Sequence, residues 1–247
     1  MKLLLLGTSG YHPTERRHTA CLMIPEAGIV LDAGTGFFRV REHVATTTLD
    51  ILLTHTHLDH VVGLTFMLST KWQKPIEQIT VHGQAAKLAA VREHLLDEQM
   101  FPAPLTCQWR PLEDGPLTIN GVRVSHFPVV HPGGCVGYRL DWPDGRSLAY
   151  VTDTTAAKSA AYVQQIRGVD VLVHECNFRD GQEEWAEKTG HSSTTPVAEV
   201  AAEAGVKRLV LTHLDSLDDS DDPVNIAAAR RIFSDVEIGY DGMTIEF

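Results

Sequence analysis

Four residues that can bind a metal ion lie within six positions, directly after the apolar segment 50–53: His55, His57, Asp59 and His60. On an extended backbone the side chains of His55 and His57 point to the same side, so they can bind one ion together. If a helix begins next, Asp59 and His60 lie in its first turn and can face a second ion. Three imidazoles and a carboxylate pack poorly in an apolar core, so this spacing predicts a metal site.

Ligand-type residues also end several other apolar segments, among them His131, Asp153 and His213. If these segments are roughly parallel strands, their carboxyl ends share one edge of a sheet, where the sites of α/β proteins collect. Each residue also has a plainer interpretation, as a surface or hydrogen-bonded histidine or, for Asp153, as a turn or helix cap. We expect all three to join the cluster at 55–60 as metal ligands. Asp32, which ends a similar segment, is expected to support a ligand or the fold.

The predicted donor set combines imidazoles and carboxylates without thiolates. It suits Zn(II), and nearly as well Mn(II) or Fe(II), and it disfavours Ca(II) and Mg(II). Seven donors are too many for one tetrahedral ion, but they suit two divalent metal ions about 3.5–4 Å apart that share a carboxylate and a bridging hydroxide. Such a pair predicts a hydrolase and favours a phosphate ester as the substrate, because two cations match its developing charge.

Two further residues, His191 and Glu175, are candidates for catalysis beside Asp59. His191 lies in the segment 189–194, just before a predicted helix, where a neighbouring Ser or Thr could be the helix cap and His191 incidental. Alternatively, its imidazole lies beside substrate oxygens and donates a hydrogen bond or a proton. Glu175 could accept a hydrogen bond from a ligand histidine, or it could be a buried acid at a strand end.

Short apolar segments alternate with turn signals and amphipathic stretches along the chain. Asn120-Gly121 predicts a two-residue hairpin turn, and Pro143-Asp144-Gly145 predicts a second hairpin. Hairpins mixed with strand–helix–strand units predict an α/β fold of two mixed sheets with helices outside. The acidic segment 215–222 is expected to be a solvated turn. The predicted strands are 2–6, 19–24, 28–32, 50–54, 77–82, 105–110, 117–119, 122–130, 135–142, 147–152, 169–174, 207–212, 236–240 and 243–246, and the predicted helices are 61–70, 84–98, 157–167, 195–204 and 223–233.

The composition describes a globular chain that can bury a core. Its 247 residues, 43% hydrophobic and 21% charged, allow one large domain or two small ones. The formal net charge of −11 opposes broad binding of nucleic acid, although it leaves room for a local basic patch. The sequence contains no signal-peptide pattern and no apolar segment near the roughly 20 residues of a membrane span. The four cysteines are scattered, so we expect a cytoplasmic protein.

The sequence resembles the metallo-β-lactamase superfamily. Residues 55–60 match its H-x-H-x-D-H motif, and the later candidate ligands follow in the order of that family, over essentially the whole chain. The resemblance implies one metallo-β-lactamase-like hydrolase domain over residues 1–247, folded as a four-layer αβ/βα sandwich with a dinuclear site at one edge. It also implies how the ligands are divided: His55, His57 and His131 for one metal, Asp59, His60 and His213 for the other, and Asp153 as the bridge.

Within the superfamily, the chain is similar to the phosphodiesterase branch. His174-Glu175 and Gly190-His191-Ser192 resemble ribonuclease Z, and the ending 239–243 resembles the phosphodiesterase of the carbon–phosphorus lyase pathway. In these relatives the counterpart of His191 meets the scissile phosphate. Ribonuclease Z usually has a long Gly- and Lys-rich arm before the bridging aspartate, whereas here only residues 132–152 fill that position. Together with the acidic charge, this favours a small phosphodiester over RNA, and the resemblance allows a homodimer.

Three functions remain open on the sequence alone. The first is a dinuclear phosphodiesterase, including a ribonuclease Z-like endonuclease that processes tRNA 3′ ends. The second is a hydrolase of the same fold that acts on a lactone, thioester or lactam, which the fold alone does not exclude. In that reaction His191 has no evident task. The third is a metal-stabilised module without catalysis, which would close its metal shell with four ligands.

Overall fold

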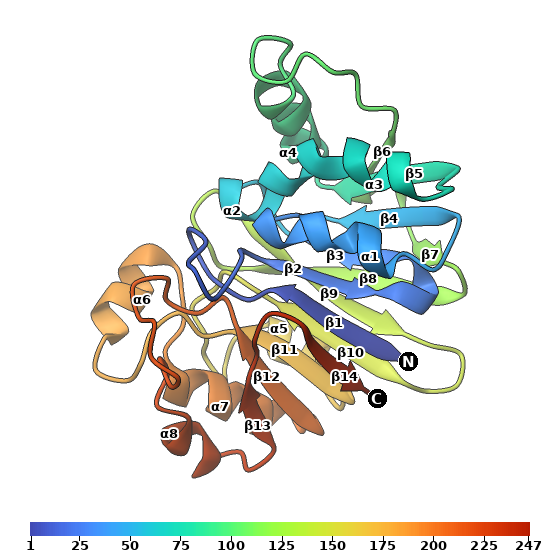
Figure 1. Ribbon diagram of the computed structural model, residues 1–247. Coiled ribbons are helices and arrows are strands. Elements are labelled where there is room, and N and C mark those ends of the chain that lie inside the picture. The colour runs from blue at the N-terminus through green and yellow to red at the C-terminus, as the bar shows by residue number, and fades with distance from the viewer.

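Two seven-stranded mixed β-sheets lie against each other in the computed structural model, which describes residues 1–247 (Figure 1). The first sheet has the order β14-β1-β2-β3-β4-β5-β6 and the second β13-β12-β11-β10-β9-β8-β7. The strands of the first sheet are β1 (Lys2–Gly7), β2 (Cys21–Ile24), β3 (Ile29–Leu31), β4 (Thr48–Leu52), β5 (Gln78–Gly83), β6 (Gln108–Pro111) and β14 (Met243–Glu246). Those of the second sheet are β7 (Leu117–Ile119), β8 (Val122–Val129), β9 (Cys135–Asp141), β10 (Ser147–Val151), β11 (Val171–Glu175), β12 (Arg208–Thr212) and β13 (Val236–Ile238).

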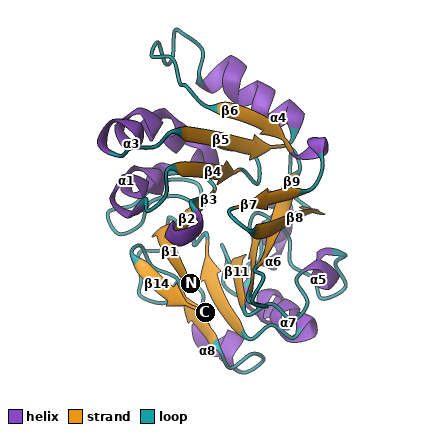
Figure 2. Cartoon of the chain, turned by 90° about the vertical axis from the view of Figure 1, so that its right-hand side faces the viewer, coloured by secondary structure: helices purple, strands orange, loops and turns teal.

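Helices cover the outer face of each sheet, so the chain forms four layers (Figures 1 and 2). The helices on the first sheet are α1 (Val40–His43), α2 (Leu58–Val61), α3 (Met67–Gln73) and α4 (Ala85–Ala90). Those packed on the second sheet are α5 (Tyr162–Gln165), α7 (Thr194–Ala204) and α8 (Ile226–Arg230), and α6 (Glu183–Thr189) precedes α7 in the chain. The predicted α/β fold of two mixed sheets with outer helices is confirmed.

Three clusters of buried apolar residues separate the four layers. In β1, Leu3 and Leu5 belong to the cluster between the two sheets, whereas Leu4 and Leu6 belong to the cluster under α1–α4. Side chains of a strand alternate between its two faces, so a strand covered on both sides must be apolar at every position. This explains the unbroken leucine run near the start of the sequence. The third cluster packs the second sheet against α5, α7 and α8.

The strand predictions agree with the structure, with bounds that differ by at most three residues. The predicted hairpin turn is present, since Asn120 and Gly121 both have positive φ, 47° and 84°, and join Ile119 to its partner Val122. Strands β3 to β6 run parallel, as do β10 to β13, and β8 runs in the direction of β10 because both are antiparallel to β9. The carboxyl ends of these strands therefore share one edge of the molecule, as predicted.

Most helix predictions were too long. The helix expected at 61–70 is divided by a 3-10 turn at 62–66, where the backbone N–H of Gly63 donates to the carbonyl of Ala33 at 2.7 Å and not to a carbonyl of the preceding helical turn. The helix expected at 157–167 is reduced to α5. The residues just before α5 form turns, in which the N–H of Ala160 donates to the carbonyl of Ala157 and the N–H of Val163 to that of Ala160.

Two other predicted helices also end early, and two short helices were not predicted. The helix expected at 84–98 keeps α-helical geometry only in α4 and continues as a π turn at 91–95. The helix expected at 223–233 begins only after Asn225, which has a φ of 55°. The short α1 and α6 lack the long periodicity that marks a helix in a sequence. Every helix is too short or too polar to cross a bilayer.

Candidate metal centre

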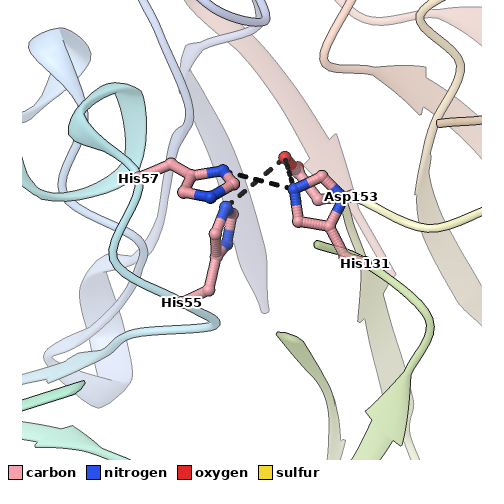
Figure 3. A group of neighbouring side chains, drawn as sticks. All are labelled: His55, His57, His131 and Asp153. Carbon is pink, nitrogen blue, oxygen red and sulfur yellow. Dashed lines mark hydrogen bonds and ion pairs between the residues drawn. The ribbon is translucent and has the colours of Figure 1, made fainter. Parts of the chain in front are cut away.

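All seven predicted ligands meet at the shared edge of the two sheets. The segment after β4 stays extended through His57 and then enters α2, so Asp59 and His60 lie in the first helical turn, as predicted. His131 follows β8, Asp153 follows β10 and His213 follows β12. Figure 3 shows the side chains of His55, His57, His131 and Asp153 turned toward a common centre.

The two carboxylate oxygens of Asp153 face two different pairs of histidines. Its Oδ2 lies 3.5 Å from Nε2 of His55 and 3.5 Å from Nε2 of His131. Its Oδ1 lies 3.2 Å from Nε2 of His60 and 3.3 Å from Nε2 of His213. A single buried carboxylate is thus shared between two groups of nitrogen atoms.

Each group is completed by one further residue. On one side, Nδ1 of His57 lies 3.2 Å from Nε2 of His131. On the other, Oδ2 of Asp59 lies 3.3 Å from Nε2 of His60 and 3.2 Å from Nε2 of His213. In each group the possible ligand atoms all lie within 4.8 Å of one another, and the groups are His55, His57, His131 and Asp153, and Asp59, His60 and His213.

Asp32 is not among the seven predicted ligands, but it forms a hydrogen bond with one of them, His60. It is fully buried, and its Oδ2 accepts hydrogen bonds from Nδ1 of His60 at 2.9 Å and from the hydroxyl of Tyr150 at 3.1 Å. Its Oδ1 accepts the backbone N–H of Thr54 at 2.8 Å. With Nδ1 of His60 donating to Asp32, Nε2 of His60 faces Asp153 and is the nitrogen available to a metal. The predicted supporting role of Asp32 is consistent with this contact.

Two other histidines are oriented in the same way. Nδ1 of His131 donates to the carbonyl of Gly190 at 2.9 Å, and Nδ1 of His55 lies 3.1 Å from the hydroxyl of Thr54. The remaining nitrogen of each ring points into the cluster. Nε2 of His55 is buried and has no hydrogen-bond partner. Buried polar atoms normally have partners, so these inward nitrogens and the shared carboxylate fit divalent cations.

The cluster perturbs the protonation of its own members. Burial alone would lower the pKa of His60, but Asp153, Asp59 and Asp32 raise it well above its usual value. Burial would raise the pKa of Asp153, but the surrounding histidines hold it well below its usual range. Burial and the neighbouring His60 lower the pKa of His55. In the metal-free protein, His60 therefore carries the proton that a bound cation must displace.

His191, which is half-buried, and the fully buried Glu175 form a second pair beside the cluster. Nδ1 of His191 donates to Oε1 of Glu175 at 3.1 Å, and Glu175 also accepts the backbone N–H groups of Thr154, Asn177 and Ser192. Burial would lower the pKa of His191, but Glu175 raises it to about 9. The partner of Glu175 is thus His191, not one of the seven predicted ligands. His191 also lies within ligand distance of Asp153 and His213.

A pocket of about 320 Å³ opens over the cluster. Its floor includes His57, Asp59, Asp153 and His213, and His191 lies in its wall. The remaining lining residues are Tyr11, Asn177, Phe178, Thr189, Asp215, Ser216 and Leu217, and none of the lining residues is Lys or Arg.

The family to which this chain belongs follows from a match over most of its length. The family model described as the beta-lactamase superfamily domain matches residues 28–214. The chain is a member of the beta-lactamase superfamily. Fold and sequence agree on this point, and the resemblance carried by the H-x-H-x-D-H motif is confirmed.

Relatives of this superfamily member extend over nearly the whole chain. It is 27% identical to a ribonuclease Z of Archaeoglobus fulgidus, covering 99% of this chain and 97% of the relative, and 29% identical to a ribonuclease Z of Myxococcus xanthus, covering 100% and 97%. These alignments run over 303 and 305 positions, more than the 247 residues here, so the relatives carry insertions.

Solved structures repeat the fold. The metallo-β-lactamase fold protein YhfI of Bacillus subtilis has a TM-score of 0.79 at 21% identity, covering 100% of this chain and 99% of that one. The short form of human tRNase Z has a TM-score of 0.78 at 20% identity, covering 100% and 99%. A diphosphatase from the PhnP family has a TM-score of 0.75 at 20% identity, covering 100% and 96%. The four-layer sandwich expected for this superfamily is confirmed.

Sequence reasoning missed several features of the superfamily member's site. Tyr11 lies at the pocket, and its backbone N–H donates to Oδ2 of Asp59 at 3.0 Å, but nothing in the sequence marks it as a site residue. The acidic segment 215–222 is not merely a solvated turn: Asp215 lines the pocket, and Asp218 forms an ion pair with Arg179.

Proposed function

We propose that this protein is a metal-dependent phosphodiesterase that binds two divalent cations, Zn(II) or Mn(II) with Fe(II) also accommodated, and hydrolyses a small phosphodiester. The observation that carries the proposal is the position of Asp153, whose two oxygens face two separate histidine pairs. A structural metal site closes its shell with four ligands around one ion, whereas a carboxylate shared by two groups is typical of hydrolytic dinuclear centres.

His55, His57 and His131 would hold one cation, Asp59, His60 and His213 would hold the other, and Asp153 faces both groups. Divalent cations held there would supply charge neutralisation for a phosphodiester and a water of lowered pKa.

The chain's own residues position the substrate and manage one proton. His191 keeps its Nδ1 proton on Glu175, which leaves Nε2 directed away from that bond. Before any cation is bound, Glu175 raises the pKa of His191 to about 9, which favours the imidazolium. In that form, with Nδ1 held by Glu175, the ring can donate from Nε2 to a phosphoryl or leaving oxygen. The three backbone N–H groups on Glu175 fix the carboxylate that orients this ring.

A small diester is favoured over a polynucleotide by charge. The net charge is −11, and the pocket is lined by Asp215 and by no Lys or Arg. Extended nucleic acids bind through many cationic contacts to phosphates. Only the hairpin β9–β10 lies between His131 and Asp153, where the resemblance to ribonuclease Z would imply a long Gly- and Lys-rich arm.

The test begins with metal-free protein prepared with a chelator. We expect two equivalents of Mn(II) or Zn(II) to bind and to restore hydrolysis of bis-p-nitrophenyl phosphate. An inert diester together with turnover of a lactone or thioester would identify the other hydrolase class. Two bound metals with no turnover of any of these substrates would leave only a metal-binding module.

Processing of tRNA 3′ ends is the second candidate, because the curated relatives are named ribonuclease Z and ribonuclease BN. A labelled tRNA precursor, assayed beside the small diester, distinguishes the two functions. Cleavage of the precursor with a kcat/KM far above that of the small diester would replace our proposal.

We further propose a cytoplasmic location and a homodimer. All four cysteines are free thiols, which suits a reducing compartment. Light scattering of the purified protein measures the oligomeric state, and fractionation of the source cells measures the location.

A further inference from the structure

Large apolar side chains are exposed at the mouth of the pocket over the metal centre. Tyr11 is 78% exposed and Leu217 is 83% exposed, and both line the pocket together with Phe178. Scattered exposed apolar residues need no explanation, but here two exposed side chains and the half-buried Phe178 gather around one cavity that also contains the candidate catalytic groups. Such a combination of an apolar wall and a few polar groups is typical of a small-molecule site.

These side chains are carried by segments that are fixed to the metal centre and to each other. The backbone N–H of Tyr11 donates to Asp59, so its ring starts directly beside the cluster. The ring of Phe178 lies 6.4 Å from that of His191, centroid to centroid. Both aromatic residues therefore line the same pocket as the candidate metal ligands.

Two ion pairs join the segments that form the mouth. Arg16, five residues after Tyr11, donates to the carbonyl of Asp219 at 2.5 Å and to Oδ1 of Asp221 at 2.7 Å. Arg179, next to Phe178, pairs with Asp218. The loop that carries Leu217 is thus connected to the segments of both aromatic residues.

The polar lining restricts which charges the bound group can carry. Asp215 is the acidic residue of the mouth, and its Oδ1 accepts the N–H of Leu217 at 2.9 Å. With no Lys or Arg in the lining, a second phosphate near the mouth would meet repulsion from Asp215 and no fixed cationic side chain other than His191. An uncharged ring that donates hydrogen bonds meets no electrostatic repulsion from Asp215.

We propose that the substrate is a phosphodiester in which at least one ester group carries a flat, uncharged ring of nucleobase or substituted-phenyl size, and that this ring stacks on Tyr11 under Leu217. The inference rests on the proposed phosphodiesterase function, because it places the diester at the metal centre. The cavity of about 320 Å³ limits the bound part to roughly one nucleoside.

The experiment compares Tyr11→Ala and Tyr11→Phe with Tyr240→Ala, which removes an equally large ring that is 57% exposed and outside the pocket. Every Tyr11 variant keeps the backbone N–H that contacts Asp59. The substrates are bis-p-nitrophenyl phosphate, which has rings, and bis(glyceryl) phosphate, which has none. Removing a stacked aromatic side chain typically lowers binding of a ring about 5- to 100-fold.

We expect Tyr11→Ala to lower kcat/KM for the aryl diester at least fivefold, through a higher KM, and to leave kcat/KM for bis(glyceryl) phosphate within twofold. Tyr11→Phe should behave like the wild type, and so should Tyr240→Ala. Equal losses on both substrates, or no loss on either, would overturn the stacking role. Leu217→Ala should show the same substrate-dependent loss as Tyr11→Ala.

A binding measurement separates this inference from the proposed function. Adenosine, titrated into the metal-loaded protein and followed by calorimetry, reports on the ring site without any hydrolysis. Adenosine binding that is weakened at least fivefold in Tyr11→Ala supports the ring site even if no diester is cleaved. Diester hydrolysis without adenosine binding, or with binding unchanged in Tyr11→Ala, would overturn the ring site and leave the phosphodiesterase proposal standing. Addition of a terminal phosphate to a dinucleoside monophosphate should lower kcat/KM, and the loss should shrink in Asp215→Asn.

Discussion

Replacement of Asp32 by Asn tests whether the proposed centre depends on a correctly oriented histidine. Asn is nearly the same size as Asp and also tolerates the left-handed backbone that this position requires, where φ is 58°. The amide oxygen can still accept the N–H of Thr54, which leaves the NH2 group facing Nδ1 of His60 and the hydroxyl of Tyr150. Two donors then face each other at His60.

The conflict is relieved if His60 moves its proton to Nε2, the nitrogen that faces Asp153. A protonated Nε2 cannot bind a metal. Loss of such a supporting hydrogen bond typically costs 10- to 100-fold in metal affinity, which is about 1.4–2.7 kcal/mol. We therefore expect Asp32→Asn to weaken one cation by this factor and to leave the cation at His55, His57 and His131 nearly unchanged.

The assay is a competitive titration of metal-free protein against a chromophoric chelator, which resolves two affinities. The matched control is Asp50→Asn, because Asp50 forms a similar pair with buried His82, with 2.7 Å between Oδ1 and Nε2, away from the cluster. Wild-type affinity at both sites in Asp32→Asn would refute the reasoning. So would an equal loss in the control, since it would point to a general loss of stability.

Three other changes have defined outcomes. Asp153→Asn should lower metal content and rate together, whereas His191→Asn should retain both metals and lose about 10²–10⁴-fold in rate; equal metal loss, measured by elemental analysis, would mean that His191 is a ligand. In the metal-free protein the pKa of His191 is about 9, above an unfolded value of about 6.5, so its stabilising contribution, up to about 3 kcal/mol, is full below pH 6.5 and lost as pH rises through 9. Plotted against pH, the free energies of unfolding of wild type and His191→Gln, measured by denaturation, should therefore converge at high pH. A constant difference between the two at all pH values would contradict this. Protein with metal at 100 times its Kd should have a free energy of unfolding about 2.7 kcal/mol per site higher than protein treated with a chelator. In Asp153→Asn most of this difference between the two samples should disappear.

Much of the fold could be predicted because the dominant signal is apolar periodicity. Strands such as β1 are covered on both faces, and this forces an unbroken apolar run that a reader of the sequence can recognise. Helices were less predictable here because several are a single turn long and are fixed by contacts from elsewhere. The 3-10 turn at 62–66, for example, includes Gly63, whose N–H donates to the carbonyl of Ala33, far away in the sequence.

The candidate site was also predictable only in part. Metal-ligand residue types at strand ends are visible in the sequence, and the parallel strands then bring His131, Asp153 and His213 to one edge. Which oxygen of Asp153 faces which histidine depends on side-chain torsions and could not be predicted. The position of Tyr11 was equally hidden, because its contact with the centre is made by a backbone N–H that any residue other than proline possesses.

Backbone strain at three strand ends shows that this site has a conformational free-energy cost. Asp32, Asp153 and His213 follow β3, β10 and β12, and all three have left-handed backbones, with φ of 58°, 48° and 53°. Left-handed geometry costs roughly 1–2 kcal/mol for most residues, less for Asp, and glycine would avoid it. Glycine has no side chain that could bind a metal or a ligand residue. The strained backbone at these positions therefore accompanies three buried polar side chains at one edge of the molecule.

Such strain persists only where the surroundings fix the conformation. Here the fixing contacts come from both sheets, since Asp32 accepts from Tyr150 of the second sheet and Gly10, after β1, leaves the space that His213 occupies. The geometry of the centre is therefore a property of the packed pair of sheets, and neither sheet alone would maintain it.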